Sequence, residues 1–414
     1  MDESISRSMG VANAAPAPGY LIVLFGALAA LGPLSVDAYL PAFPMIAHDF
    51  GVSIVSVQNT LSAFLIGYAL GQFFGGSFSD QIGRKRIGYV GLGVYICASL
   101  AIAFAGNVSQ MLVLRFLQAI GGGFSTVICM ASVRDVYPLE QLGRRFATVT
   151  MIVLCAPLVA PVIGTALVPF GWHKIFLVKA AYAAALLCAY TALVPETRLG
   201  SWRSLSVRSI FVQCFEVVTR RVDGRRVPIR YACAMGLASS CLMMFVTNAS
   251  FIYQEYFGVS GFAFPLVFAL SVLGFMSMNL FSMKRLKPHN APAFFRRGLA
   301  MQLVAVAALV AVVAGGYARL ATFVPFIVMM MSALGLVGPA GSSRYMSFFH
   351  KLAGSAASVY TTLMFALGGI LGALTGVFYN GTLLPIVGVM LAASLLANTI
   401  GLSLPKGAPA EARA

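Results

Sequence analysis

The chain has 414 residues, of which 59% are hydrophobic and only 10% are charged. A water-soluble domain cannot bury so large a share of apolar side chains, so the composition excludes a soluble protein and predicts a polytopic membrane protein. The net charge of +16 does not indicate a nucleic-acid partner, because the lysines and arginines fall in the gaps between apolar runs.

Twelve apolar runs follow a polar, then Ala/Pro-rich tail at 1–19. Each run holds about 20 residues or more, enough to cross a hydrocarbon core of ~30 Å as a helix. The sequence therefore predicts an all-α membrane protein with twelve transmembrane helices. We place them at 20–43, 54–78, 87–106, 109–133, 145–169, 174–195, 231–255, 262–283, 296–316, 320–343, 353–379 and 382–403.

The longest gap, 196–230, is rich in arginine and divides the chain into two blocks of six spans. This division predicts two pseudo-symmetric six-helix bundles, related by an axis along the membrane normal. The bundles would span 20–195 and 231–403, with a basic linker at 196–230 and a C-terminal tail at 404–414. Since the cations gather in alternate gaps, the positive-inside rule predicts that the linker and both termini are cytoplasmic.

The gap after the second span holds an acid, two glycines and three consecutive cations. Charges this dense must lie at a membrane surface. We expect Asp80 to bond backbone N–H groups or Arg84, and so to hold neighbouring helix ends together as a conformational latch, which Arg134 and Asp135 could join. The alternative is a loop that only sets orientation, which leaves the glycines and the acid unexplained. The latch residues are Gly76, Asp80, Gly83, Arg84, Lys85 and Arg86.

Two charged residues lie inside spans of the first block. Asp37 and Arg115 are each about six residues from the outer end of their spans, or ~9 Å deep. Because an unpaired charge there costs several kcal/mol, each should face a cavity or the other. We expect Asp37 to bind the proton and cationic substrates, with Arg115 setting its charge state; a static ion pair is the alternative. Gln118 and Tyr39 would join this site.

Pro157, Pro161 and Gly164 lie in the fifth span. The prolines interrupt backbone hydrogen bonds, and the glycine permits close helix approach. These residues would either stiffen the helix and limit leak, or serve ordinary helix packing.

Aromatic, methionine and amide side chains could line an adaptable cavity, although helix packing is the commoner reason for such residues. The candidates are Tyr68, Met244, Asn248, Phe268, Asn279 and Tyr360. We expect Lys179 in the sixth span to extend to the lipid headgroups, with a substrate-counterion role as the alternative. Glu255 is expected at the outer interface.

The four histidines lie near span ends and form no cluster with acids or cysteines at metal-ligand spacing. The sequence also contains no P-loop for ATP hydrolysis. We therefore expect no metal, no other cofactor and no enzymatic activity, with protons as the coupling ion.

Several of these motifs resemble those of the major facilitator superfamily. The loop from Gly76 to Arg86 is similar to its signature loop, and the Arg115-to-Gln118 stretch resembles its span-four Arg/Gln motif. The stretch from Ala156 to Gly164 resembles the antiporter motif, but reads Ala160-Pro161-Val-Ile-Gly164-Thr165 where Gly-Pro-x-x-Gly-Gly is usual.

With Asp37-Ala-Tyr39-Leu-Pro41 in span one and Pro195-Glu196-Thr197 after span six, the chain resembles Bcr/CflA-type (bicyclomycin- and chloramphenicol-resistance) drug/proton antiporters. The resemblance implies a monomer in the bacterial inner membrane that exports small amphipathic compounds in exchange for protons, by alternating access. Its partners would be a small-molecule substrate and the lipid bilayer. The alternative is a member of the superfamily dedicated to one metabolite.

Overall fold

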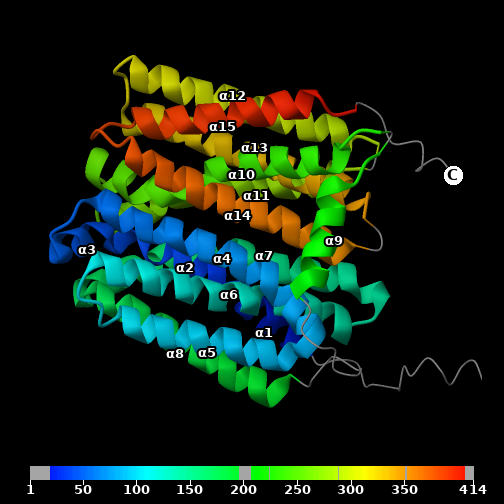
Figure 1. The fold of residues 1–414 in the computed structure, drawn as a ribbon. Helices are drawn as coiled ribbons and strands as arrows, with labels where there is room; N and C mark the ends of the chain where they lie inside the picture. Colours follow the sequence, from blue (N-terminus) through cyan, green and yellow to red (C-terminus); the bar gives the residue numbers. More distant parts are fainter. Residues whose placement is uncertain (1–18, 195–206, 223, 288, 350–351, 406–414) are drawn as a thin grey trace, which may run out of the picture.

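The structure is a computed structural model that describes residues 19–194, 207–222, 224–287, 289–349 and 352–405. Within these ranges the regular structure is helical, apart from an isolated bridge between Val222 and Arg225. The all-α prediction is therefore confirmed. In Figure 1 the long helices run side by side across the view, with the first half of the chain in the lower part and the second half in the upper part.

The first half consists of α1 (Tyr20–Ala29), α2 (Leu31–Asp37), η1 (Leu40–Ala42), α3 (Phe43–Phe50), α4 (Ile54–Ile82), α5 (Arg84–Ile102), α6 (Val108–Val136), α7 (Leu139–Leu167), η2 (Val168–Phe170) and α8 (Trp172–Leu193). The second half consists of α10 (Val227–Ser250), η3 (Phe251–Tyr256), α11 (Ala263–Arg285), α12 (Ala291–Ala314), α13 (Leu320–Met346), α14 (Ala353–Val377) and α15 (Leu384–Leu402). Between the halves, α9 (Val207–Thr219) crosses one end of the bundle (Figure 1). The predicted boundary at 195–196 lies outside the described residues.

Among the described helices, eleven are long and apolar enough to cross a membrane. The first predicted span is broken into Tyr20–Ala29 and Leu31–Phe50, which meet at a bend of 41°. Pro33 explains the position of the break, because it has no N–H to donate to the carbonyl of Ala29 four residues earlier. Counted as one span, the bent pair completes the twelve predicted spans.

The two halves share an apolar core at the end of the bundle that carries α3. One continuous cluster there joins α3 and the beginning of α4 to the end of α10, η3 and the beginning of α13. At the opposite end, which carries α9, each half has a separate cluster. The buried side chains of the two halves thus form one shared cluster at the α3 end and two clusters at the α9 end, where Phe73, Phe74 and Phe78 of α4 also pack against the cluster of the second half.

Two close contacts hold the α3 end together. The first is between α4 and α14, where a Cβ added at Gly369 would lie 2.8 Å from Ile66 Cγ1 and 2.9 Å from the Ser62 carbonyl oxygen. In the second, Gln254 Nε2 donates a hydrogen bond to the Leu40 carbonyl at 3.1 Å. Gln254 lies in η3, which is a π-helical turn at the end of α10.

Gly369→Val is expected to destabilise the protein, because the added methyl groups must separate α4 from α14. Overpacking of this kind typically costs about 1–3 kcal/mol. The matched control is Gly388→Val on α15, where an added Cβ meets no atom within 4 Å. Thermal unfolding in detergent should show a lower midpoint for Gly369→Val than for Gly388→Val, and equal midpoints would contradict the tight contact.

Candidate functional site

A cavity of about 290 Å³ lies between the two halves. Its walls are largely apolar and include five aromatic residues, Phe64, Tyr68, Phe268, Phe275 and Phe365. Asp37 is the one charged residue among those that line it, and only 4% of this residue is exposed. The cavity therefore holds a single carboxyl group among apolar side chains, and residues of both halves line it.

Asp37 is the last residue of α2, directly beyond the break in the first span. The bent span continues to Phe50, beyond the predicted end at residue 43, so Asp37 lies near its middle. The predicted depth of ~9 Å is therefore wrong, because the sequence gives no direct sign that the helix continues through Pro41 and Pro44.

Next to Asp37, the backbone carbonyl of Ser35 accepts hydrogen bonds from two buried cations. Lys179 Nζ donates at 2.9 Å and Arg115 Nη1 at 3.3 Å. Ser35 lies in the last turn of α2, where helix carbonyls have no partner within the helix, so this oxygen is available. The early end of α2 thus provides the acceptor for both cations.

Lys179 does not extend to the headgroups as predicted. Only 6% of the residue is exposed, and its ammonium group interacts electrostatically with Asp37. The Lys179 nitrogen also lies 4.7 Å from the ring centroid of Phe176 and 5.5 Å from that of Tyr39. The prediction fails because it treated Lys179 as a residue near the lipid, whereas α8 turns it towards α2.

Arg115 is fully buried and is held by aromatic rings and an amide rather than by Asp37. Its guanidinium carbon lies 4.3 Å from the Phe64 ring centroid and 4.6 Å from that of Tyr39. Nη1 also donates to Gln118 Oε1 at 2.7 Å. Among the described salt bridges, none joins Arg115 to Asp37. The alternative of a static pair between Asp37 and Arg115 is therefore not seen among these contacts, and Lys179 is the cation whose charge acts on Asp37.

Gln118 and Tyr39 belong to the same buried network without lining the cavity. Gln118 Nε2 donates to Ser99 Oγ at 2.7 Å, and the Tyr39 hydroxyl is 3.0 Å from Thr60 Oγ1. The Ser35 hydroxyl forms a short hydrogen bond with the hydroxyl of Tyr95. Helices α2, α4, α5, α6 and α8 are therefore tied together by polar contacts around Ser35.

The proline and glycine motif of α7 packs against the segment that carries Asp37. Pro157 lines the cavity. A Cβ added at Gly164 would collide with the carbonyl group of Ala38. The glycine is therefore required for close approach, and the position of α7 is set by the backbone that directly follows Asp37.

Comparison with known proteins decides the family. The family model described as Major Facilitator Superfamily matches residues 23–373, which is most of the chain. The chain belongs to the major facilitator superfamily.

Several relatives are named as drug-resistance proteins, and two of them match most of the chain. The bicyclomycin resistance protein homolog of Haemophilus influenzae is 29% identical over 89% of this chain and 92% of its own. A chloramphenicol resistance protein of Pseudomonas aeruginosa is 28% identical over 84% of this chain and 81% of its own. The structure of a D-xylose-proton symporter superposes with a TM-score of 0.72 at 13% identity, covering 93% of this chain and 97% of the symporter, which shows a shared fold. This chain is therefore a transporter, not an enzyme.

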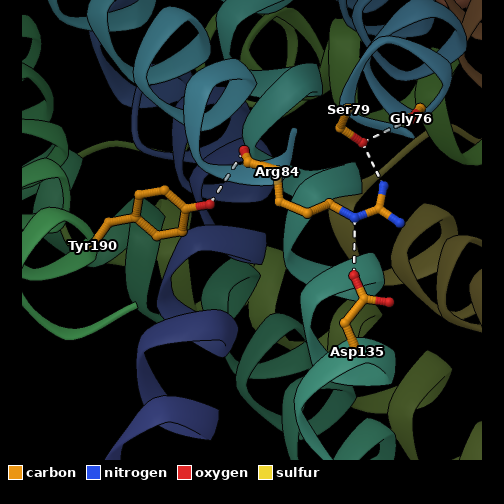
Figure 2. Close-up of polar contacts among 5 residues, drawn as sticks. All are labelled: Gly76, Ser79, Arg84, Asp135 and Tyr190. Carbon is orange, nitrogen blue, oxygen red and sulfur yellow. Dashed lines mark hydrogen bonds and ion pairs between the residues drawn. The ribbon is translucent and has the colours of Figure 1, made fainter. Parts of the chain in front are cut away.

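The loop that resembles the superfamily's signature is organised by Arg84 (Figure 2). Arg84 Nε donates to Asp135 Oδ2 at 3.0 Å, and Nη1 donates to Ser79 Oγ at 2.6 Å. The Tyr190 hydroxyl donates to the Arg84 carbonyl at 3.4 Å. One arginine therefore connects α4, α5, α6 and α8, all in the first half. Its acidic partner Asp135 is one of the two residues expected to be able to join the latch.

The other latch residues lie around this arginine. Gly83 has φ of +114°, a backbone conformation that residues with a side chain rarely adopt, so a glycine suits this turn. Gly76 accepts a bond from Ser79 Oγ at 2.7 Å, and Lys85 Nζ donates to the Thr191 carbonyl at 3.1 Å. Arg86 is exposed, and the side chain of Asp80 lies outside the described residues.

Of the six predicted cavity residues, Tyr68 and Phe268 line the cavity and the other four do not. Asn248 instead donates to Thr375 Oγ1 at 3.1 Å, and Met244 lies in the shared core. Asn279 and Tyr360 are half-buried elsewhere. On α10 the lining residues are Leu242, Met243 and Val246, and Met244 is turned away from them because one step along a helix turns a side chain by about 100°. Glu255 is exposed in η3, at the α3 end.

Asp135→Asn is expected to lower stability by about 1–3 kcal/mol, because it replaces a charge-assisted hydrogen bond to a buried guanidinium. The matched control is Glu140→Gln, an exposed acid in the first turn of α7. Thermal unfolding in detergent measures the difference. If both variants unfold at the same temperature as the parent protein, the bond from Arg84 to Asp135 does not stabilise the fold.

Proposed function

We propose that the protein is a proton-coupled exporter of small amphipathic compounds, cations among them. The observation that carries this proposal is Asp37, a carboxyl group in an apolar, aromatic cavity between the two halves. A carboxylate close to aromatic rings suits an organic cation, which gains from both charge and ring faces. The names of the two resistance relatives support drug export, and the apolar walls are a poor match for a sugar.

We further propose that Asp37 and Lys179 exchange the coupled proton as a pair. The Lys179 and Arg115 nitrogens both lie within 3.3 Å of one oxygen, so they are no more than about 6.6 Å apart. Two positive charges at that distance repel by roughly 2.5 kcal/mol at an effective dielectric constant of ~20. A cationic substrate next to Asp37 adds a third positive charge. Since an arginine keeps its proton, the charge that can leave is the proton of Lys179.

The transport cycle would rock the two halves about this cavity. One shared cluster at the α3 end, against two clusters at the α9 end, supports a state that receives substrate from the α9 side. We assign that side to the cytoplasm, since exposed arginines concentrate there, and the protein to the bacterial inner membrane with both termini cytoplasmic. Proton binding from outside would then favour release of the substrate.

Asp37→Asn is expected to reduce proton-driven transport at least roughly tenfold, since an amide can neither take up a proton nor balance a cation. The measurement is uptake of a fluorescent organic cation into inverted membrane vesicles, with and without a proton uncoupler. Glu255→Gln, an exposed acid at the α3 end, is the control. Unchanged uncoupler-sensitive transport by Asp37→Asn would refute the assignment of Asp37.

Lys179→Arg is expected to weaken cation binding by roughly tenfold or more, because it fixes a second permanent charge beside Arg115. Lys179→Met should bind the cation at least as well as the parent protein. The measurement is equilibrium binding of tetraphenylphosphonium to purified protein, with Lys174→Arg and Lys174→Met at an exposed position of α8 as controls. A purely structural lysine would give the opposite order, with arginine tolerated best.

The alternative function is transport of one dedicated metabolite. The number of different compounds that the protein transports distinguishes it from drug export. A panel of chemically different antibiotics and dyes, with and without the uncoupler, tests it. Export of several unrelated compounds supports the drug exporter, while a response to one compound alone supports the dedicated transporter.

A further inference from the structure

Helix α9 has one face buried against the second half. Ile210, Cys214 and Val217 are spaced on one side of the helix and belong to the apolar cluster of that half. Ser355 Oγ at the beginning of α14 donates to Gln213 Oε1 at 2.8 Å. The helix is therefore docked on the protein, and its orientation about its own axis is set.

Other apolar side chains of α9 are exposed rather than buried in this cluster. Phe215 is 69% exposed and Val212 is 56% exposed. Phe211, 54% exposed, also reaches Phe73 of α4, with 5.9 Å between the ring centroids. Exposed phenylalanine and valine in adjacent turns are unfavourable in water, so this face requires an apolar environment.

Positive charge surrounds this exposed face. The six described arginines between 207 and 230 are exposed, and the described salt bridges include none of them. They are Arg208, Arg220, Arg221, Arg225, Arg226 and Arg230. Glu216 is the acid that α9 itself contributes. The surface therefore offers apolar side chains and uncompensated cations together.

We propose that α9 is a membrane-surface site that binds anionic lipid headgroups through its arginines and inserts the Phe215 face among the acyl chains. Figure 1 shows α9 crossing the spanning helices at the end of the bundle, so its axis lies along the membrane surface when the spans cross the bilayer. An amphipathic helix with a basic rim in that position matches the charge and the polarity profile of an anionic leaflet. Because Phe211 also contacts α4, lipid at this site touches both halves.

The test uses Phe215→Trp in the full-length protein, reconstituted with lipids that carry brominated acyl chains, which quench tryptophan on contact. Fluorescence of the parent chain, with its two tryptophans, is subtracted. We expect brominated phosphatidylglycerol to quench the new tryptophan more strongly than brominated phosphatidylcholine at the same mole fraction. Each arginine near an anionic surface strengthens binding by roughly fivefold, so Arg220→Gln, Arg221→Gln and Arg225→Gln combined should abolish the preference.

Two controls match these variants. Phe104→Trp places a tryptophan at another highly exposed phenylalanine, 82% exposed between α5 and α6, and should be quenched equally by both lipids. Arg297→Gln removes an exposed arginine from α12 and should leave the preference intact. Equal quenching of Phe215→Trp by both lipids overturns the anionic site. If neither brominated lipid quenches the tryptophan of Phe215→Trp, the anionic site is overturned as well. If aqueous iodide also fails to quench it, the occupant of this face is a protein.

Discussion

The buried charges of this protein depend on one backbone carbonyl, that of Ser35. In a low-dielectric interior, two cations and a carboxyl group are costly unless each has a partner. The break after α1 and the early end of α2 free the Ser35 oxygen, which accepts from Lys179 and Arg115. Aromatic rings cover the remaining faces of both cations. A broken helix is thus the condition for placing charge at this depth.

The packing of the two halves is unequal along the membrane normal. At the α3 end one continuous apolar core joins them, whereas at the α9 end the buried side chains form a separate cluster in each half, with phenylalanines of α4 packed against the cluster of the second half. The contacts of Arg84 at the α9 end join helices within the first half and do not cross to the second half. A half that is rigid in itself can move as a body, which is what alternating access requires.

The sequence predicted the spans and the family because both depend on local composition: apolar runs, alternating basic gaps and short motifs. It failed where a side chain depends on a distant backbone atom. Lys179 was expected in the headgroups, since nothing in the sequence marks Ser35 as an acceptor. The sequence did allow Asp135 to join the latch, and its bond to Arg84 forms because α5 packs against α6. Met244 was expected in the cavity wall and lies in the core instead, because hydropathy does not fix helix boundaries, and hence the direction of each side chain, to one residue.

The π-helical turn η3 has a consequence for how the α3 end can separate. A π-helix holds one residue more than an α-helix over the same stretch, which offsets the side chains beyond it by about 100°. That offset lies where Gln254 bonds the Leu40 backbone, so the bond does not depend on the side chain at position 40. A return to α-helical register would rotate the amide away and break the bond. Parting of the halves at this seam is therefore linked to a change in the winding of the chain over Phe251–Tyr256.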